Sequence, residues 1–483
     1  MKVSIIWISV LLSLCCTAQD SALQLALKEF SSKDHLTHSS IGISIIELKT
    51  GHMIGSFQEQ KSLVPASSLK LLTTLSAIYY LGEDFRYQTT LAHSGSVFTD
   101  GTLEGNIYLI GSGDPSLGSE KMGDYKGVLQ LSKKISSDIR EYGISCIAGD
   151  IVADESVFNS FPISPSWQWN DLGNYYASGA WGVNVNDNLY RIYFAQQPKE
   201  GMVPKLRRYQ PYIPKLELQN EVESGPKGSG DNAYIFGGPY NYTKRIVGTI
   251  PPGTGEFSIK GSIPDPPLFM AYHLQHALHN SEIFSDDYKA IHMFDERSTS
   301  RQIIKVYRSP ALKKLVYHTN NKSDNLYAEA ILKTLGHGYQ QKGSGSSGIA
   351  AIKQYLTDQD ISISGLRMDD GSGLSARNRI TAKLMSKFLA STAAELGLQK
   401  VCSYLPKGGE EGTVASLFKE SPVKGRIFLK SGSMEGIMSY SGFLKSKSGK
   451  WHSFCIIVNG YEVPNRRMRQ HLESLMTLIY NKT

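Results

Sequence analysis

The sequence contains few cysteines, and their number limits the kinds of fold that the chain can adopt. Cys15 and Cys16 directly follow an apolar N-terminal stretch, which leaves Cys146, Cys402 and Cys455 for the remainder of the chain. Three thiols in so long a chain exclude a disulfide-rich scaffold, although one pair is possible and at least one thiol must stay unpaired. Their spacing matches no zinc motif.

The chain also lacks a large excess of charge of either sign. The chain has 51 Lys and Arg against 44 Asp and Glu, a net charge of +7, and no basic or acidic tail. We therefore expect no nucleic-acid partner.

HExxH and phosphate-loop motifs are absent too. His273, His276 and His279 recur every three residues, but no carboxylate or cysteine completes a ligand set. We interpret them as packing and surface histidines, and we expect neither a metal nor a cofactor.

Long apolar runs are missing except at the N-terminus. Lys2 precedes the apolar residues 3–14, and small residues follow, a pattern that predicts a signal peptide over residues 1–18. A membrane anchor is the first alternative, but a spanning helix needs about 20 apolar residues. A lipoprotein signal is the second, but no small residue precedes Cys15 or Cys16. We expect a secreted protein with no transmembrane helix after cleavage.

The length and the patterning of the chain indicate more than one domain. With 483 residues, of which 41% are hydrophobic and 20% charged, the sequence is typical of a globular protein of several domains. Alternating apolar and polar residues indicate hairpins near both ends, beside apolar helices. Between residues 89 and 296, short strands alternate with glycine- and proline-bearing turns. We predict a discontinuous α/β (α+β) domain of residues 19–88 and 297–483, interrupted by a β-rich insertion over 89–296 of one or two nested subdomains.

Three short motifs occur in a fixed order along the chain. S-x-x-K occupies residues 67–70, S-D-N residues 323–325 and K-S-G residues 430–432. Motifs of this kind form the signature of penicillin-binding proteins and class A β-lactamases. Each motif alone is weak evidence, because S-x-x-K also begins at Ser224, Ser416 and Ser421, and K-S-G recurs at residues 447–449.

The surroundings of Ser67 and Lys70 distinguish this S-x-x-K from the others. The motif follows Pro65 and opens a helix that is apolar nearly all round, and residues three apart share one face of a helix. The hydroxyl and the amine can therefore meet, and burial disfavours a charged ammonium, as a lysine base requires. The alternative is a serine cap with a lysine that extends to solvent.

The other two motifs have comparable alternatives. Residues 323–325 begin a helix, where serine and aspartate also serve as caps. The K-S-G at 430–432 follows an apolar strand whose edge can pair with an extended peptide. Gly432 permits close approach of the backbone, and Lys430 and Ser431 can hold a carboxylate. The order and context of the three motifs together favour the catalytic interpretation.

Longer segments around the motifs resemble one known family. They are the nucleophile region at 63–70, Gly-Asp-Pro at 113–115, Trp-Asn-Asp at 169–171, Asp-Pro at 265–266, residues 309–329, and Asp-Gly-Ser-Gly-Leu-Ser at 370–375. In these segments the chain is similar to the D-Ala-D-Ala carboxypeptidases of peptidase family S13, the penicillin-binding protein 4 type. The resemblance implies a serine β-lactamase/DD-peptidase-like transpeptidase domain, an antiparallel sheet flanked by helices, with a large insertion between the first two motifs.

This resemblance implies acyl transfer on peptidoglycan stem peptides that end in D-Ala-D-Ala, by carboxypeptidase or endopeptidase cleavage. Ser67 attacks the carbonyl between the two D-alanines, and Lys70 accepts its proton. β-Lactams would acylate Ser67 and leave slowly. The other implied roles are proton relay for Ser323, substrate orientation for Asn325, positive field for Lys430, carboxylate binding for Ser431 with Lys430, and an oxyanion hole from the N–H groups of Ser67 and Ser433, beside Gly432.

Two departures from the family pattern bear on specificity. Ser431 stands where threonine is commoner, a change that keeps the hydroxyl. Ala376 separates the motif at 370–375 from Arg377, whereas arginine often follows at once in the family. Through the resemblance, Arg377 and Asp171 are candidates for binding the stem-peptide side chain.

The oligomeric state stays open. Two alternative functions also remain: a β-lactamase of the same fold and a non-catalytic wall-binding protein. We expect a periplasmic or otherwise extracytoplasmic location.

Overall fold

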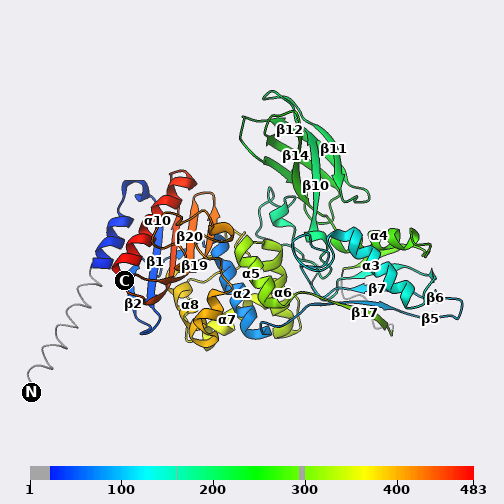
Figure 1. Cartoon of the computed structure of the whole chain (residues 1–483), viewed down its shortest axis with the longest axis horizontal. Helices are drawn as coiled ribbons and strands as arrows, with labels where there is room; N and C mark the ends of the chain where they lie inside the picture. Colours follow the sequence, from blue (N-terminus) through cyan, green and yellow to red (C-terminus); the bar gives the residue numbers. More distant parts are fainter. Residues whose placement is uncertain (1–21, 160, 293–299) are drawn as a thin grey trace, which may run out of the picture. The chain divides into compact units, whose positions relative to one another are not determined.

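The computed structural model describes residues 22–159, 161–292 and 300–483 (Figure 1). The predicted signal peptide, residues 1–18, lies outside the described residues. The chain divides into two compact units, the first formed by residues up to 80, 316–324 and 349–483, and the second by residues 81–315 and 325–348. The domain boundaries drawn from the sequence, after residues 88 and 296, stay a prediction.

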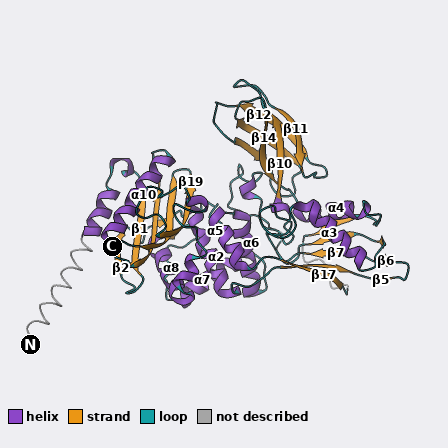
Figure 2. Cartoon of the chain, viewed as in Figure 1, coloured by secondary structure: helices purple, strands orange, loops and turns teal. Residues whose placement is uncertain are grey.

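The first unit is built on a five-stranded antiparallel sheet with the strand order β19-β20-β21-β1-β2 (Figure 2). On one face, Leu27 from the helical residues 22–31 and Leu472 from α10 join the apolar core of the sheet. On the other face lies α8, whose Ser386 hydroxyl is 2.6 Å from that of Ser44 in β1. An antiparallel sheet flanked by helices confirms the predicted fold class.

The elements of the first unit have the following bounds. The strands are β1 (Ser40–Glu47), β2 (Met53–Phe57), β3 (Ser62–Leu63), β18 (Ile380–Thr381), β19 (Ile427–Met434), β20 (Ile437–Lys445) and β21 (Trp451–Asn459). The helices are α2 (Lys70–Leu81), α8 (Ala382–Leu396), α9 (Leu398–Cys402) and α10 (Asn465–Lys482), with the 3₁₀ turns η1 (Asp34–Leu36), η2 (Ala66–Leu69) and η5 (Gly412–Val414). Two further helices have residues in both units, α5 (Leu312–Lys322) and α7 (Gly345–Asp358).

The second unit is rich in strands, which confirms the β-rich character predicted for the insertion. Its sheets have the orders β16-β9-β7-β4-β17, β11-β10-β15, β12-β14-β13 and β5-β6-β8. One apolar core runs through it and includes Leu109 of β7, Ile135 of α3, Phe194 of β10, Ile246 of β14 and Leu274 of α4. Burial of these side chains away from water supplies the main stabilisation of such a unit.

The elements of the second unit have the following bounds. The first strands are β4 (Gln88–His93), β5 (Ser96–Val97), β6 (Thr102–Glu104), β7 (Ile107–Ile110), β8 (Cys146–Ala148) and β9 (Ile151–Asp154). The later strands are β10 (Leu189–Ala195), β11 (Lys205–Gln210), β12 (Glu217–Ser224), β13 (Asn232–Phe236), β14 (Thr243–Ile250), β15 (Glu256–Ser262), β16 (Tyr288–Ile291) and β17 (Gln302–Arg308). The helices are α3 (Gly127–Glu141), α4 (Pro266–His279) and α6 (Asn325–Gln340), with η3 (Tyr175–Ala177) and η4 (Asn186–Asn188).

The three cysteines of the described residues are all free. The pair that the sequence left possible therefore does not form. Cys402 and Cys455 are buried, and burial raises the pKa of each thiol to about 12. Both thiols accordingly serve as small packing groups rather than as reactive nucleophiles.

His292, which is half-buried, lies between two buried carboxylates in the second unit. Its Nδ1 lies 2.7 Å from Glu155 Oε1, and its Nε2 lies 3.3 Å from Asp265 Oδ2. Asp265 caps α4 by accepting from the Leu268 N–H, and Glu155 accepts from the Gly182 N–H. The imidazole therefore joins the start of α4 to the segments around residues 155 and 182. Although burial opposes it, hydrogen bonding to the two carboxylates raises the pKa of His292 to about 10.

We expect the His292→Gln variant to be less stable than wild type at neutral pH by roughly 3–5 kcal/mol, because two buried carboxylates lose their cation. The pKa of His292 is about 10 in the folded chain and 6.5 ordinarily. Its stabilisation is therefore complete below pH 6.5 and is lost as the pH rises towards 10. Thermal unfolding measured across this range should show the difference shrinking with pH. His52→Gln, a change at an exposed histidine, is the control, and a pH-independent difference would contradict the prediction.

Candidate active site

Ser67 lies in the 3₁₀ turn η2, directly before α2. Its side chain is partly accessible, whereas Ser68 and Lys70 are buried. The residue before it, Ala66, has φ of +47°, a left-handed conformation that is costly for a residue with a Cβ atom. The Pro65 carbonyl holds this turn by accepting from the hydroxyls of Ser68 (2.9 Å) and Ser439 of β20 (2.5 Å). The surrounding structure thus fixes the backbone that presents the Ser67 hydroxyl.

Lys70 is the first residue of α2 and is fully buried. Its Nζ donates to Ser67 Oγ at 3.0 Å and to the Ser372 carbonyl at 2.6 Å. The amine and the hydroxyl therefore meet as the spacing of three residues predicted, and the alternative of a lysine that extends to solvent is wrong. Leu71 and Leu72 beside it are also fully buried.

The loop at 370–375 supports Lys70 from the other side. The carboxylate of Asp370 accepts from the N–H groups of Gly373 (2.8 Å) and Ser375 (2.6 Å) and from the Asn378 amide (2.8 Å). At Gly373 φ is +79°, and an added Cβ would lie 2.0 Å from the Ala66 carbonyl oxygen. The loop therefore packs directly on the nucleophile turn and aims the Ser372 carbonyl at Lys70. Sequence reasoning noted this motif but assigned no role to Asp370 or Ser372.

Strand β19 brings the third motif against the same turn. A Cβ added to Gly432 would lie 2.8 Å from the Ser67 nitrogen and 2.6 Å from the Pro65 oxygen. Glycine is therefore required for the strand to pass this closely. The next residue along β19, Ser433, is exposed. Lys430 and Ser67 are thus held in one place by contacts between β19 and η2.

Lys430 is fully buried, and its Nζ donates to the Ser431 carbonyl at 2.5 Å. Burial, together with the charge of nearby Lys70, holds the pKa of Lys430 well below its usual range. The hydroxyl of Ser431 is half-buried and lies 3.3 Å from that of Thr413. The amines of Lys70 and Lys430 therefore lie close enough within the first unit for the charge of one to act on the other.

The second motif lies between α5 and α6. Ser323 is half-buried and has φ of +58°, again left-handed for a residue with a side chain. Asn320, near the end of α5, is joined to α2 through the Thr74 hydroxyl (3.3 Å) and donates to the Tyr404 carbonyl (3.0 Å). These bonds tie the segment before Ser323 to the helix that begins at Lys70.

Asn325 belongs to the second unit and contacts the insertion there. Its side-chain amide donates to the Tyr176 carbonyl at 2.8 Å. The hydroxyl of the same tyrosine donates to Asp171 Oδ1 at 2.9 Å, and burial raises the pKa of Asp171. Tyr176 therefore connects two residues that sequence reasoning singled out separately, and it was missed because nothing in the sequence marks it.

Arg377 lies in the first unit with a largely exposed side chain. Its Nε lies 3.0 Å from Asp369 Oδ2, so the guanidinium already has an acidic partner. Arg377 belongs to the first unit and Asp171 to the second. Their assignment to a shared specificity site stays a prediction.

The three histidines of α4 have separate surroundings. His273 Nε2 lies 3.0 Å from the Tyr212 carbonyl oxygen, and burial lowers the pKa of His273 to about 4. His276 stacks on Tyr272, and His279 Nε2 lies 3.3 Å from Ser285 Oγ. Across residues 22–159, 161–292 and 300–483, no cluster of three or more His, Cys, Asp or Glu side chains is arranged to hold a metal ion.

The chain is similar to several known proteins in sequence and in fold. The model of the D-Ala-D-Ala carboxypeptidase 3 (S13) family matches residues 23–478. A D-alanyl-D-alanine carboxypeptidase of Actinomadura sp. (strain R39) is 23% identical over 435 residues, which cover 88% of this chain and 78% of that protein. The D-alanyl-D-alanine carboxypeptidase DacB of Haemophilus influenzae is 22% identical over 451 residues, 92% and 91% of the two chains. The crystal structure of penicillin-binding protein 4 from Haemophilus influenzae superposes with a TM-score of 0.80 at 21% identity, covering 94% of this chain and 99% of that one.

Proposed function

The chain belongs to the D-Ala-D-Ala carboxypeptidase 3 (S13) family and is a D-alanyl-D-alanine carboxypeptidase, and we propose that it works through an acyl-enzyme on Ser67. The observation that carries this proposal is the distance of 3.0 Å between Lys70 Nζ and Ser67 Oγ. A serine hydroxyl becomes a useful nucleophile when a base lies within hydrogen-bond reach. The substrates are peptidoglycan stem peptides that end in D-Ala-D-Ala, and cross-linked peptides are included because the same acyl group is transferred.

In the acylation step, Ser67 Oγ forms a bond to the carbonyl carbon between the two D-alanines. The bond from that carbon to the nitrogen of the terminal D-alanine breaks. Lys70, with its amine neutral, accepts the hydroxyl proton, and Ser323 passes a proton to the leaving nitrogen. Asn325 orients the substrate amide. Water then hydrolyses the ester, which releases the shortened peptide and restores Ser67.

Lys70 and Lys430 share the positive charge of the site. Both amines are buried, and the charge of Lys70 lowers the pKa of Lys430, so two ammonium groups side by side are unfavourable. A substrate carboxylate bound by Lys430 and Ser431 would favour the charged form of Lys430. The repulsion between the amines would then leave Lys70 neutral, as a base must be. In this scheme, binding of the substrate carboxylate keeps Lys70 neutral, so that Lys70 can accept the proton of Ser67.

The oxyanion of the tetrahedral intermediate requires N–H donors, which we assign to Ser67 and Ser433. The close approach of Gly432 to the Ser67 nitrogen supports this assignment, since it sets β19 beside the nucleophile turn. Donors fixed in this way need no reorganisation when charge develops on the oxygen, which is why such holes contribute strongly to catalysis.

β-Lactams should act as covalent inhibitors of this chain. The ring carbonyl presents an acyl group that Ser67 can accept, while the leaving nitrogen stays attached to the inhibitor and hinders attack by water. A structure of the Haemophilus influenzae protein was solved in complex with a β-lactam, which supports the proposal.

We place the mature protein outside the cytoplasm, because its polymeric substrate is part of the cell wall. A signal peptide over residues 1–18 would direct secretion across the inner membrane, into the periplasm or another extracytoplasmic space. In the part of the chain that the structure describes, no helix has both the length and the apolar character needed to cross a membrane.

A two-part assay tests the proposed function. The full chain is incubated with a fluorescent penicillin, and D-alanine release from a synthetic peptide ending in D-Ala-D-Ala is measured separately. We expect a covalent label that leaves slowly, together with release of D-alanine. Rapid turnover of the penicillin without D-alanine release would select the β-lactamase alternative instead. Absence of both label and D-alanine would select the non-catalytic wall-binding protein.

A further inference from the structure

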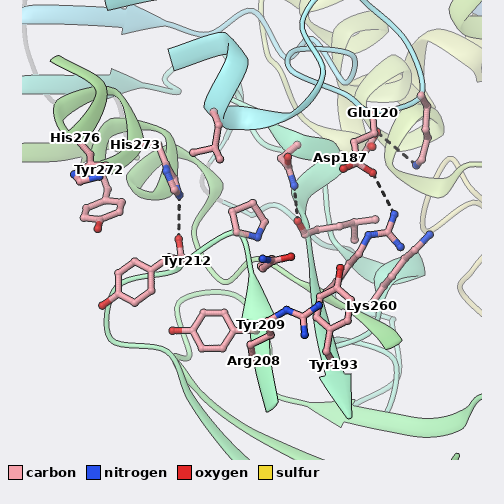
Figure 3. Close-up of a pocket in the computed structure, with 17 residues that line it drawn as sticks. Glu120, Asp187, Tyr193, Arg208, Tyr209, Tyr212, Lys260, Tyr272, His273 and His276 are labelled. Carbon is pink, nitrogen blue, oxygen red and sulfur yellow. Dashed lines mark hydrogen bonds and ion pairs between the residues drawn. The ribbon is translucent and has the colours of Figure 1, made fainter. Parts of the chain in front are cut away.

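The second unit contains a cavity of about 970 Å³ that the proposed reaction does not use (Figure 3). Its walls come from β10, β11, β15 and α4, and from the segments at residues 120–121 and 186–187. Cavities of this size suit an organic ligand. None of the residues that line it belongs to the proposed catalytic set, and Ser67 and Lys70 belong to the other unit.

One part of the cavity wall is formed by aromatic rings. Tyr212 stacks near-parallel to Tyr209, with ring centroids 6.2 Å apart, and Tyr272 stacks in the same way on His276 at 6.1 Å. Tyr212 and Tyr272 are themselves 5.8 Å apart, which makes the rings one continuous surface. Tyr212 is 55% exposed although it is large and aromatic. Exposed tyrosines offer an apolar face and a hydroxyl, the combination that suits a sugar ring.

The other part of the wall is charged, with an excess of cations. Arg191 pairs with Glu120 at 3.1 Å, and Lys121 with Asp187 at 3.5 Å. Among the described residues, the side chain of Lys260 on β15 makes no hydrogen bond and no ion pair. Burial and the charges of Arg191 and Lys121 lower the pKa of Lys260, in spite of the two carboxylates. The cavity therefore presents a cation in a region of positive potential, which attracts an anionic group.

The charged part is also held rigidly. Asn186 and Asp187 line the cavity and, with Asn188, have three successive φ values between +54° and +57°. A left-handed run of three residues that carry side chains is unusual and persists only where neighbours fix it. Here the Asn186 amide donates to the Leu189 carbonyl (2.8 Å), and the Ser119 hydroxyl donates to Asp187 (2.6 Å). Preorganisation of this kind lowers the cost of binding a ligand.

We propose that this cavity is a second binding site that takes an anionic saccharide segment of the cell-wall polymer, its sugar stacked on Tyr212 and Tyr272 and its acidic group on Lys260. The proposal rests on the proposed function for its choice of polymer. The acidic group is a carboxylate if the segment is a sugar with its attached stem peptide, and a phosphate if it is a phosphate-bearing wall glycan. Binding here would hold the polymer on the insertion while other stem peptides are cleaved.

The test is an equilibrium titration of the full chain with a soluble disaccharide that carries a tripeptide stem. This probe lacks D-Ala-D-Ala, so its binding does not depend on the reaction at Ser67. A second titration uses the same probe with its carboxylates amidated, and a third uses a glycerol-phosphate oligomer. The variants are Lys260→Gln and Tyr212→Ala, with Lys227→Gln, an exposed lysine of the same unit outside the cavity, as the matched control.

We expect Lys260→Gln and Tyr212→Ala each to weaken binding of the acidic probe by about tenfold or more, and Lys227→Gln to leave it unchanged. Amidation should weaken binding of the wild-type chain by a similar factor. Tighter binding of the phosphate oligomer, lost in Lys260→Gln, would support the site with phosphate as the acidic group. No binding of any probe by the wild-type chain, or equal binding by all variants, would overturn the proposal. Release of D-alanine from a short peptide tests the proposed function separately, so the two can fail independently.

Discussion

Replacing Ser67 by alanine is expected to lower kcat/KM for D-alanine release by about 10³-fold or more and to abolish covalent labelling by penicillin. The variant keeps the backbone of η2 and loses only the hydroxyl that lies 3.0 Å from Lys70 Nζ. Without that oxygen no acyl-enzyme can form, whatever the remaining residues bind. The measurement is D-alanine release under substrate-limiting conditions, with labelling followed on the denatured protein.

The chain supplies a matched control for this variant. Ser416 begins another S-x-x-K but is an exposed serine between η5 and β19. Ser416→Ala should therefore keep both activities at the wild-type level, which separates the effect of the site from the effect of the pattern. If Ser67→Ala still took up penicillin, or if Ser416→Ala lost activity to the same extent, the assignment of the nucleophile would be wrong.

The spacing and apolar context of Ser67 and Lys70 were enough to predict their contact, because it is local. A separation of three residues at the start of a helix brings two side chains to the same face, and the flanking leucines predict burial. The structure adds one detail, since Ser67 lies in a 3₁₀ turn and the α-helix begins only at Lys70. Local patterns of this kind depend little on the remainder of the fold.

The support of Lys70 by the loop at 370–375 could not be predicted from the sequence. Its contact is made by the backbone carbonyl of Ser372, 302 residues away, and a carbonyl is present at every position. Only the folded chain shows that Asp370 gathers three donors to hold this loop in place. The segment at 370–375 contributed to the resemblance to the S13 family, but nothing in it identified the partner against which the loop packs.

The charge state of Lys430 is a second feature that could not be predicted from the sequence. The resemblance to the S13 family implied that Lys430 adds positive field. Its burial and its proximity to Lys70, which lower its pKa, arise from the packing of β19 against η2. These are long-range contacts, so the sequence predicted which residue is present but not how readily it carries a proton.

In the insertion, the sequence pattern predicted the strands but not their order in the sheets. Alternating short strands and turns correctly indicated β-rich structure. The strand orders include the parallel pairs β7 with β9 and β12 with β14, which are joined through intervening elements. Such pairings depend on how the apolar core closes, not on the period of any single strand. The cavity beside Lys260 is a product of that closure.

Replacing Lys70 by methionine should remove the base while keeping the volume of the side chain. We expect kcat/KM for D-alanine release and the rate of acylation by penicillin both to fall by about 10²- to 10⁴-fold, the range associated with loss of a general base. Methionine is unbranched and apolar, so it suits a site where Lys70 has no exposed surface. Lys419→Met, at the exposed lysine of the S-x-x-K that begins at Ser416, is the matched control and should keep its activity.

The two buried amines lead to a second expected result for Lys70→Met, which concerns stability and not activity. Because Lys70 lowers the pKa of Lys430, its removal should raise the pKa of Lys430 and relieve repulsion inside the site. Thermal unfolding of Lys70→Met should therefore occur at or above the wild-type temperature at neutral pH. Lys70→Arg provides the complementary test, since arginine carries a positive charge but cannot accept a proton. If Lys70→Arg kept activity within tenfold of wild type, Lys70 would act through its charge, and the assignment of Lys70 as the base would have to be abandoned.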